Sequence, residues 1–282
     1  MSGQARVVNV YDEGAMVGTS LRGGHGQGFI IDVDGQRVLF DTGLRGRYLL
    51  HNLRVLKIKP ESIDLVILSH GHRDHCGGLP ALLDEREEPL PVIAHPLIWE
   101  SRAKGPGLPI INIGFPRLNA AQREKMQLRE VEGWNRISEH LQVTGSIADR
   151  RDIQALGRNL YRHRDGKWGK DRFDDEISLV IESKNGPVLI TGCGHPGITN
   201  ILRHVVNHYG KDVHAVIGGA HMESFRKREV ERVAEIIIDE FETPQLYLNH
   251  CTGPNGIMRM REHLGLDGVR DCFVGTELLF PL

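Results

Sequence analysis

The most chemically informative stretch of the sequence is HGHRDH, residues 70–75, which places three histidines and an aspartate within six positions. It directly follows IDLVILS, residues 63–69, an apolar and β-branched run that predicts a buried strand. Burying so many polar side chains without partners would be costly, whereas neutral imidazole and carboxylate are ligands for Zn(II), Fe(II) and Mn(II). We therefore predict a metal site at the end of this strand, with the candidate ligands His70, His72, Asp74 and His75.

Three further histidines follow predicted strands or lie in glycine-rich turns. His95 follows the apolar run at 92–94, and His25 stands in a glycine-rich loop beside a predicted hairpin. His221 follows a predicted strand at 213–217 and two glycines. We treat these histidines as candidates for a pocket around the metal, with His25 and His95 as substrate-binding residues.

The elements that must position these side chains alternate between strands and helices, which favours a sheet covered by helices. Apolar runs predict strands at 28–33, 37–40, 63–69, 92–94, 177–183, 187–191 and 213–217. Helical patterns predict helices at 78–85, 120–132, 196–209 and 224–241. Residues 105–172 are the least regular part, and we predict them to be lids and loops inserted into a single domain that spans residues 1–282.

Composition excludes several classes of protein. The 282 residues are 40% hydrophobic and 26% charged, which is ordinary for a globular protein. The 35 Lys and Arg against 37 Asp and Glu give a net charge of -2, so no basic surplus drives general binding to nucleic acid or to a membrane surface. The widely spaced cysteines and the start of the chain, which lacks a secretory pattern, predict reduced thiols and a cytoplasmic location.

Four blocks of the sequence together resemble the metallo-β-lactamase-fold hydrolases. They are DTG at 41–43, HGHRDH at 70–75, TGCGH at 191–195 and NHCTG at 249–253, in the order of that family. The blocks at 192–197, 218–222 and 250–253 are most similar to the branch of dihydropterin ribofuranosyl-aminobenzene-phosphate synthase-like proteins, which is named for a step of methanopterin biosynthesis.

The resemblance implies an α/β fold, a four-layer αβ/βα sandwich with two metals in a groove at one edge of the sheets. Carried over residue by residue, His70 and His72 would hold the first metal, and the second would be held by Asp74, His75 and His250. The family usually has a bridging aspartate where this chain has Cys193, and a histidine shortly before it that is missing here. His195 is our candidate for the missing imidazole.

The resemblance leaves the roles of Cys193 and His221 open. Cys193 is either a thiolate ligand of the second metal or a small buried residue that shapes a turn. If it does not bridge, water alone bridges the metals, or only one metal is bound tightly. His221 resembles the histidine that protonates a leaving group in some nucleases of the superfamily, and a structural role is equally open.

These features favour a hydrolase as the leading function. A metal lowers the pKa of bound water to about 7, so a metal-bound hydroxide becomes available at neutral pH, and Asp74 or its metal-bound water handles the proton. We expect two divalent ions, zinc first and manganese or iron as alternatives. A small anionic substrate, a phosphoester above all, is favoured by the basic residues Arg102, Lys104, Arg117, Arg123, Lys125, Arg150, Arg151, Arg158, Arg162 and Arg164, some of which could receive a phosphate.

Three alternatives stand beside hydrolysis. The first is the synthase reaction of the resembling branch, a condensation in which metals organise pyrophosphate or a similar leaving group. The second is an iron-containing redox or oxygen-binding protein of the same fold, and the third is a binding module without chemistry, which the complete HGHRDH motif disfavours. Nucleic acid and membranes are not expected partners, and a homo-oligomer is possible.

Overall fold

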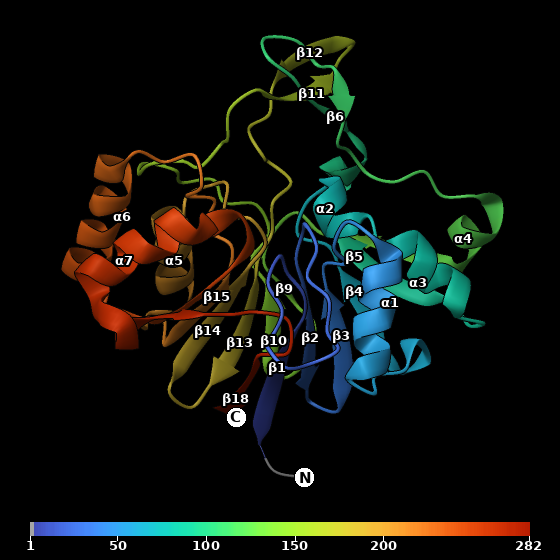
Figure 1. Cartoon of the computed structure of the whole chain (residues 1–282), viewed down its shortest axis with the longest axis horizontal. Helices are drawn as coiled ribbons and strands as arrows, with labels where there is room; N and C mark the ends of the chain where they lie inside the picture. The colour runs from blue at the N-terminus through green and yellow to red at the C-terminus, as the bar shows by residue number, and fades with distance from the viewer. Residues whose placement is uncertain (1–2) are drawn as a thin grey trace.

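The computed structural model describes residues 3–282, which form two seven-stranded sheets and one four-stranded sheet. The two large sheets pack face to face, and helices cover the outer face of each, so that the chain forms four layers (Figure 1). The predicted αβ/βα sandwich is therefore confirmed. Within the described residues, no helix has both the length and the apolar character needed to cross a membrane.

The first sheet is built mostly from the N-terminal half of the chain. Its strands, in spatial order, are β18 (Glu277–Pro281), β1 (Gln4–Tyr11), β2 (Gly28–Val33), β3 (Gln36–Phe40), β4 (Leu65–Ile67), β5 (Leu90–Ala94) and β8 (Met126–Glu130). The predicted hairpin of β2 and β3 turns at Asp34 and Gly35, both at positive φ as a primed turn requires. From β3 to β8 the strands are parallel, so their carboxyl ends lie at one edge.

The second sheet comes from the C-terminal half. Its strands, in order, are β17 (Val269–Asp271), β16 (Gln245–Leu248), β15 (Ala215–Gly218), β14 (Gly186–Thr191), β13 (Leu179–Ser183), β10 (Leu141–Val143) and β9 (Asn135–Arg136). Strands β14 to β17 are parallel, so they too end at a common edge.

Helices cover both outer faces. On the first sheet these are α1 (Gly46–Val55), α2 (Arg73–Cys76), α3 (Leu79–Glu85) and α4 (Ala120–Lys125); on the second they are α5 (Ile198–Tyr209), α6 (Lys227–Glu240) and α7 (Gly253–Gly268). Short 3₁₀ turns are η1 (Pro60–Ser62), η2 (Pro96–Trp99) and η3 (His250–Thr252). The predicted helices around α3, α5 and α6 are confirmed, and α5 ends at Gly210 in the left-handed conformation expected of a terminating glycine.

Three apolar clusters hold the layers together. Alternate side chains of a strand enter different clusters: on β14, Val188 and Ile190 face the space between the sheets, whereas Leu189 faces the helices. The same alternation on β2 places Ile31 between the sheets and Ile30 under α1 and α3. Both faces of each sheet are thus buried, which explains the continuous apolar runs in the sequence.

The region at 105–172 is more ordered than the sequence predicts. It supplies β8 to the first sheet and β9 and β10 to the second. The helix predicted at 120–132 begins as expected, with a capping box between Asn119 and Gln122, but it ends at Lys125. The prediction of its C-terminal half is wrong because Met126 and Leu128 pair with β5 and pack against the apolar cluster under α1 and α3. This tertiary contact overrides helix propensity.

The remaining strands of this region, together with β6 just before it, form a projecting tip. The tip is a four-stranded sheet of β12 (Lys167–Lys170), β11 (Leu160–Arg164), β6 (Ser101–Lys104) and β7 (Ile111–Asn112), at the top of Figure 1. Arg102 on β6 ties the tip to the body, because its buried guanidinium contacts Asp171 at 3.1 Å and Asp175 at 2.7 Å. Asp175 also accepts a hydrogen bond from the Gly71 N–H, so the anchor reaches the histidine motif.

Replacing Arg102 should destabilise the protein strongly. Arg102→Met leaves Asp171 and Asp175 buried without their counter-charge, and we expect the free energy of unfolding to fall by about 3–5 kcal/mol. Urea denaturation measures the change, with the exposed Arg123→Met as a control that should stay within about 0.5 kcal/mol of the parent. Equal stabilities of the two variants would contradict the anchoring role.

Candidate metal centre

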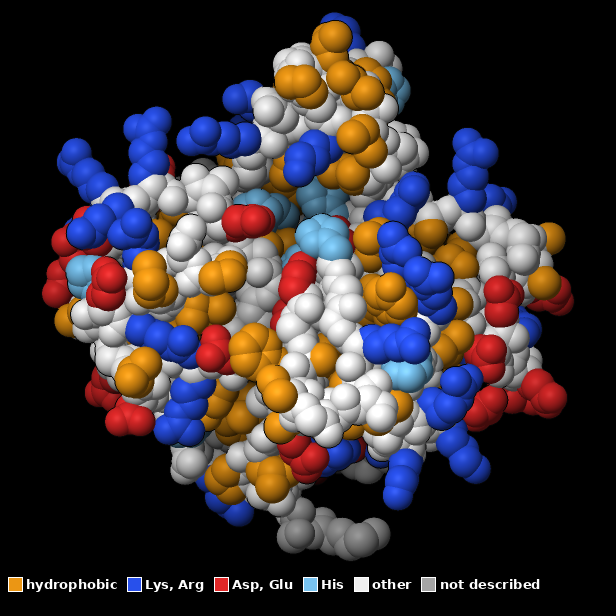
Figure 2. All heavy atoms as spheres, in the orientation of Figure 1, with side chains coloured by type: hydrophobic (Ala, Val, Ile, Leu, Met, Phe, Trp, Pro, Cys, Tyr) orange, Lys and Arg blue, Asp and Glu red, His pale blue; other side chains and the backbone are white. Residues whose placement is uncertain are grey.

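Histidines gather where the carboxyl ends of the two sheets meet. The chain leaves β4 into His70, β14 into Cys193 and β16 into His250, all at this edge. Figure 2 shows the pale-blue histidine side chains beneath the projecting tip, between the two halves of the molecule. Segments far apart in sequence thus bring their polar side chains to one place.

The first group of possible ligands is His70, His72 and His195. One ring nitrogen from each lies within 4.8 Å of the others, and all three residues are buried. Their Nε2 atoms are buried and have no hydrogen-bond partner within residues 3–282. The structure therefore brings His195 beside the motif histidines, where the missing imidazole was expected.

Neighbouring groups set the orientation of these rings. The Nδ1–H of His195 donates to the Ala155 carbonyl at 2.7 Å, which leaves its Nε2 with the lone pair. The hydroxyl of Ser69 donates to Asp41 at 2.7 Å, so it accepts from the Nδ1–H of His70 at 2.9 Å. Both Nε2 lone pairs consequently face the group.

Burial also keeps these rings neutral. It lowers the pKa of His72 to about 3 and those of His70 and His195 well below the usual value, and repulsion from neighbouring histidines lowers the last two further. Neutral imidazole is the form that binds metal ions, so no proton has to be removed from these rings before binding.

The second group is Asp74, His75 and His250, whose ligand atoms also lie within 4.8 Å of one another. The Nδ1–H of His75 donates to Asp41 at 2.6 Å, which turns its Nε2 inward. The Nδ1 of His250 contacts Glu13 at 2.9 Å, and its Nε2 lies 3.6 Å from Asp74 Oδ2. A carboxylate behind each histidine is the arrangement that orients metal-binding imidazoles.

His25 lies at the exposed mouth of this second group. Its Nε2 is 3.2 Å from Asp74 Oδ2 and its Nδ1 is 2.8 Å from Glu13 Oε1. Hydrogen bonds to these two carboxylates raise the pKa of His25 to about 9. Burial lowers the pKa of His250, but the neighbouring Cys251 sulfur and the same two carboxylates raise it well above the usual value. The positive charge of these two rings balances Asp74 and Glu13, and a metal ion bound at His250 would replace the proton on its Nε2.

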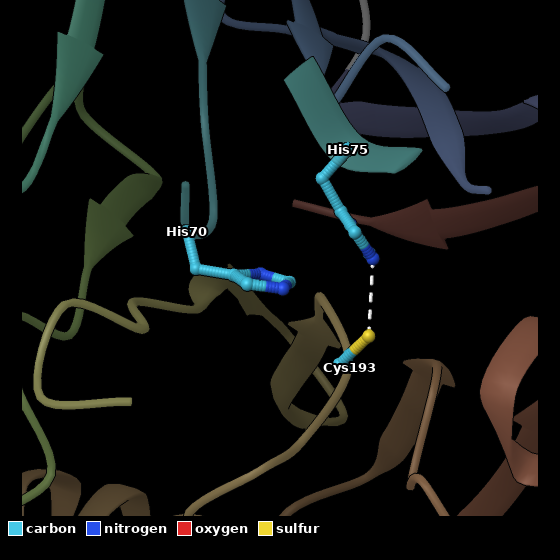
Figure 3. A group of neighbouring side chains, drawn as sticks. All are labelled: His70, His75 and Cys193. Atoms are coloured by element: carbon cyan, nitrogen blue, oxygen red, sulfur yellow. Dashed lines mark hydrogen bonds between the residues drawn. The ribbon is translucent and has the colours of Figure 1, made fainter. Parts of the chain in front are cut away.

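Cys193 lies between the two groups. Its sulfur is within 4.8 Å of ligand atoms of His70 from the first group and His75 from the second, and the Nε2 of His75 is 3.0 Å from it (Figure 3). Burial raises the pKa of the Cys193 thiol, so in this state the S–H donates to the His75 nitrogen. Cys193 is thus near candidate ligands of both groups, and the two alternatives of a thiolate ligand and a purely packed cysteine stay open.

The other two predicted pocket histidines lie in different settings. His221 lies 4.2 Å from His195 between ring centroids, and one of its ring nitrogens is close to the sulfurs of Cys193 and Cys251. Its Nδ1 is buried without a partner among residues 3–282. His95 has both nitrogens engaged: Nδ1 accepts from the Leu97 N–H, and Nε2 contacts the Ser146 hydroxyl at 2.9 Å.

Sequence reasoning missed several supporting residues. Glu13, Asp41 and Glu176 are the carboxylates behind the candidate ligands, and Phe173 stacks on His195 at 3.4 Å between ring centroids. Glu176 accepts hydrogen bonds from the Gly194 and His195 N–H groups, and burial raises its pKa to about 8. Only Asp41 carried a signal, as part of the DTG block at the end of a strand.

These observations fit metal binding. The unpartnered Nε2 atoms of His70, His72 and His195 would each be costly in a buried site, and a cation held by this first group would satisfy all three. The donor set of imidazole, carboxylate and thiol is suited to divalent transition metals. The chain therefore holds candidate His, Asp and Cys groups for metal ions.

Comparison with known proteins identifies relatives across most of the chain. A model of the metallo-beta-lactamase superfamily matches residues 21–140. The chain is 32% identical over 245 residues to a 7,8-dihydropterin-6-methyl-4-(beta-D-ribofuranosyl)-aminobenzene-5'-phosphate synthase of Methanocaldococcus jannaschii, and the match covers 81% of each protein. An uncharacterised protein of the same organism is 29% identical over 244 residues, which cover 84% of this chain and 88% of that protein.

A solved structure is similar over nearly the whole length. The crystal structure of Tm1679, a metal-dependent hydrolase of the beta-lactamase superfamily, superposes with a TM-score of 0.82 at 27% identity and covers 97% of this chain and 98% of its own. The resemblance inferred from the sequence blocks is thus confirmed at the level of fold and superfamily.

The leading sequence prediction, hydrolysis of a small phosphoester, is wrong in its reaction class. The relative with 32% identity is a synthase, which favours the condensation that the sequence offered as an alternative. The physical reason is that HGHRDH identifies a metal site and does not specify which bond is broken or which nucleophile attacks. The chain is an enzyme of the metallo-beta-lactamase superfamily and belongs to the family of this dihydropterin synthase.

Proposed function

We propose that the protein is a synthase that joins a dihydropterin, activated as a diphosphate on its 6-methylene carbon, to the amine of an aromatic ribosyl phosphate. The observation that carries this proposal is the 32% identity to the archaeal synthase over 81% of both chains. The buried imidazole groups and the cationic His25 at their mouth support an anionic substrate. The expected partner is thus a small phosphate-bearing molecule.

Two divalent ions, zinc first, would be held by this chain. His70, His72 and His195 would hold one and Asp74, His75 and His250 the other, with Cys193 between them. Imidazole and thiolate are the ligands that zinc prefers, and manganese or iron is the alternative. When bound, such ions supply positive charge to the diphosphate leaving group.

The reaction balances with groups of this chain. The amine nitrogen forms a bond to the methylene carbon, the carbon–oxygen bond to diphosphate breaks, and the amine loses a proton. The Nδ1 of His221, which lacks a partner in the described part of the chain, would accept that proton. Asp74 and Glu13 would keep His25 protonated, so that its charge attracts the anionic substrate. His95 would line the substrate side through its ring face.

A coupled assay tests the proposal. Metal-loaded protein is mixed with the dihydropterin diphosphate and 4-(β-D-ribofuranosyl)aminobenzene 5'-phosphate, and the joined product and diphosphate are measured by mass spectrometry. We expect equal amounts of both, and a fall of roughly a hundredfold or more in His72→Ala, since losing even an outer partner of a ligand costs up to that much. Diphosphate release without joined product would contradict the synthase.

Removing His195 should reduce the metal content. We expect His195→Ala, and the bulkier His195→Gln, to lower the ratio of metal to protein by about one ion, because a three-imidazole set loses a member. Elemental analysis gives the ratio, and circular dichroism shows that the variants are folded. The exposed His263→Ala is the matched control. An unchanged ratio in both His195 variants would remove His195 from the ligand set.

Cobalt substitution tests Cys193 directly. A thiolate bound to Co(II) adds near-ultraviolet charge-transfer absorption, which we expect in the parent and not in Cys193→Ser. Cys193→Asp should still bind two ions, because a carboxylate is also a ligand. The buried Cys272→Ser, at another place in the core, should keep the absorption. If the absorption persists in Cys193→Ser and disappears in Cys251→Ser, the thiolate ligand is Cys251 and not Cys193.

A further inference from the structure

A pocket of about 470 Å³ lies beside the metal centre and takes no part in holding it. His95, one of its lining residues, directly follows β5. Its walls are formed by His95, Leu97, Ser146, Ile147, Ala148, Arg150, Gln154, Arg172 and Asp174. Such a volume accommodates a sugar phosphate or a part of a larger substrate.

Two segments that line the pocket also contain the residues that contact the His195 ring. Arg172 and Asp174 face the pocket, whereas Phe173 between them stacks on the His195 ring. Gln154 faces the pocket, and the carbonyl of the next residue, Ala155, accepts the His195 Nδ1–H. The pocket and the candidate metal centre thus border the same two segments of the chain.

The pocket carries an excess of positive charge. Arg150 and Arg172 line it with a single carboxylate, that of Asp174. This carboxylate is already shared, since it lies 3.3 Å from Arg162 and 3.8 Å and 3.9 Å from Arg150 and Arg164. Arg172 forms no ion pair within residues 3–282. An anion is the ligand that this imbalance would bind.

Arg150 is held rigidly before any ligand arrives. Its side chain is only 10% exposed, and it donates to the carbonyls of Ile147 at 2.7 Å, Arg172 at 2.5 Å and Phe173 at 3.1 Å. The Arg150 guanidinium group has five N–H donors, and these three hydrogen bonds leave two of them for a ligand. A cation fixed in this way loses little side-chain entropy on binding.

Ser146 and His95, which also line the pocket, add no negative charge to it. The Ser146 hydroxyl donates to the Asp174 carbonyl at 2.8 Å, so it must accept from His95, which places the His95 proton on Nε2. The Nδ1 of His95 accepts from the Leu97 N–H, and burial lowers the pKa of this ring. His95 is thus a neutral structural wall, and the charge of the pocket comes from its arginines.

We propose that this pocket binds the phosphate group of the ribosyl phosphate substrate, which places the aromatic amine toward the metal centre. The proposal rests on the proposed synthase function for the identity of the substrate. The pocket itself is a phosphate site formed by Arg150 and Arg172, across the Phe173 segment from His195. Arg172 is the residue to change, because it is exposed and Arg150 also holds backbone carbonyls.

Calorimetric titration of the metal-loaded protein with ribose 5-phosphate tests this site without turnover. We expect Arg172→Met to raise the dissociation constant roughly tenfold and Arg172→Glu to abolish binding, since a charged hydrogen bond is lost or replaced by repulsion. The neighbouring Arg151→Met, whose side chain is exposed and paired with Asp149, should change it less than about twofold. Unphosphorylated ribose should not bind. Binding of ribose 5-phosphate that is unchanged in both Arg172 variants would overturn the site.

Inorganic diphosphate distinguishes the two phosphate-bearing substrates. Its affinity should be unaffected by Arg172→Met, because its contacts would lie at the metal centre; a loss equal to that of ribose 5-phosphate would overturn the assignment to the sugar phosphate. Arginine-dependent binding without any joined product would retain the pocket and reject the synthase. Joined product together with arginine-independent binding would reject the pocket and retain the synthase.

Discussion

The structure depends on buried imidazoles whose lone pairs are forced to face one another. A ring nitrogen without a partner in a dry interior is costly, and here the Nε2 atoms of His70, His72 and His195 are all in that condition. A metal ion held by His70, His72 and His195 together would relieve this cost. Because the opposite nitrogens of His70, His75 and His195 are committed to a hydroxyl, a carboxylate and a carbonyl, the rings cannot simply turn away.

The two packed sheets create the place where this can occur. Parallel strands of both sheets end at one edge, and the turns that follow them contain unusual backbone: Asp41, His221 and His250 are non-glycine residues at positive φ. Such conformations cost free energy and persist where the surroundings hold them. Asp41 shows how, since its carboxylate accepts from the Ser69 N–H, the Ser69 hydroxyl and the His75 ring, and so joins the ends of β3 and β4.

Whether the sequence predicts a feature depends on how far apart in the chain the interacting residues are. HGHRDH and the apolar strand before it are local, so the motif, most strands and three helices were predictable. The Glu13 contact with His250 spans 237 positions, and neither residue's neighbours in the chain reveal it. The helix predicted at 120–132 failed for the same reason, because pairing with β5 determines the conformation of Met126 and the residues after it. The reaction class was also beyond the motif, which specifies ligands and no substrate.

The arginines illustrate the same limit and show where substrate selection would lie. In the sequence they belong to one basic region, but the fold gives them different surroundings. Arg102 forms a buried ion pair with Asp171, and Arg151 is exposed beside Asp149. Arg150 is held in the wall of the pocket by a hydrogen bond to the Ile147 carbonyl. The short segment from 171 to 175 connects these parts. Asp171 and Asp175 neutralise the anchor of the tip, Phe173 packs on His195, and Arg172 and Asp174 face the pocket. Since different side chains of the same segment contact the candidate ligand His195 and line the pocket, the pocket wall can change in sequence without any change in the candidate ligands.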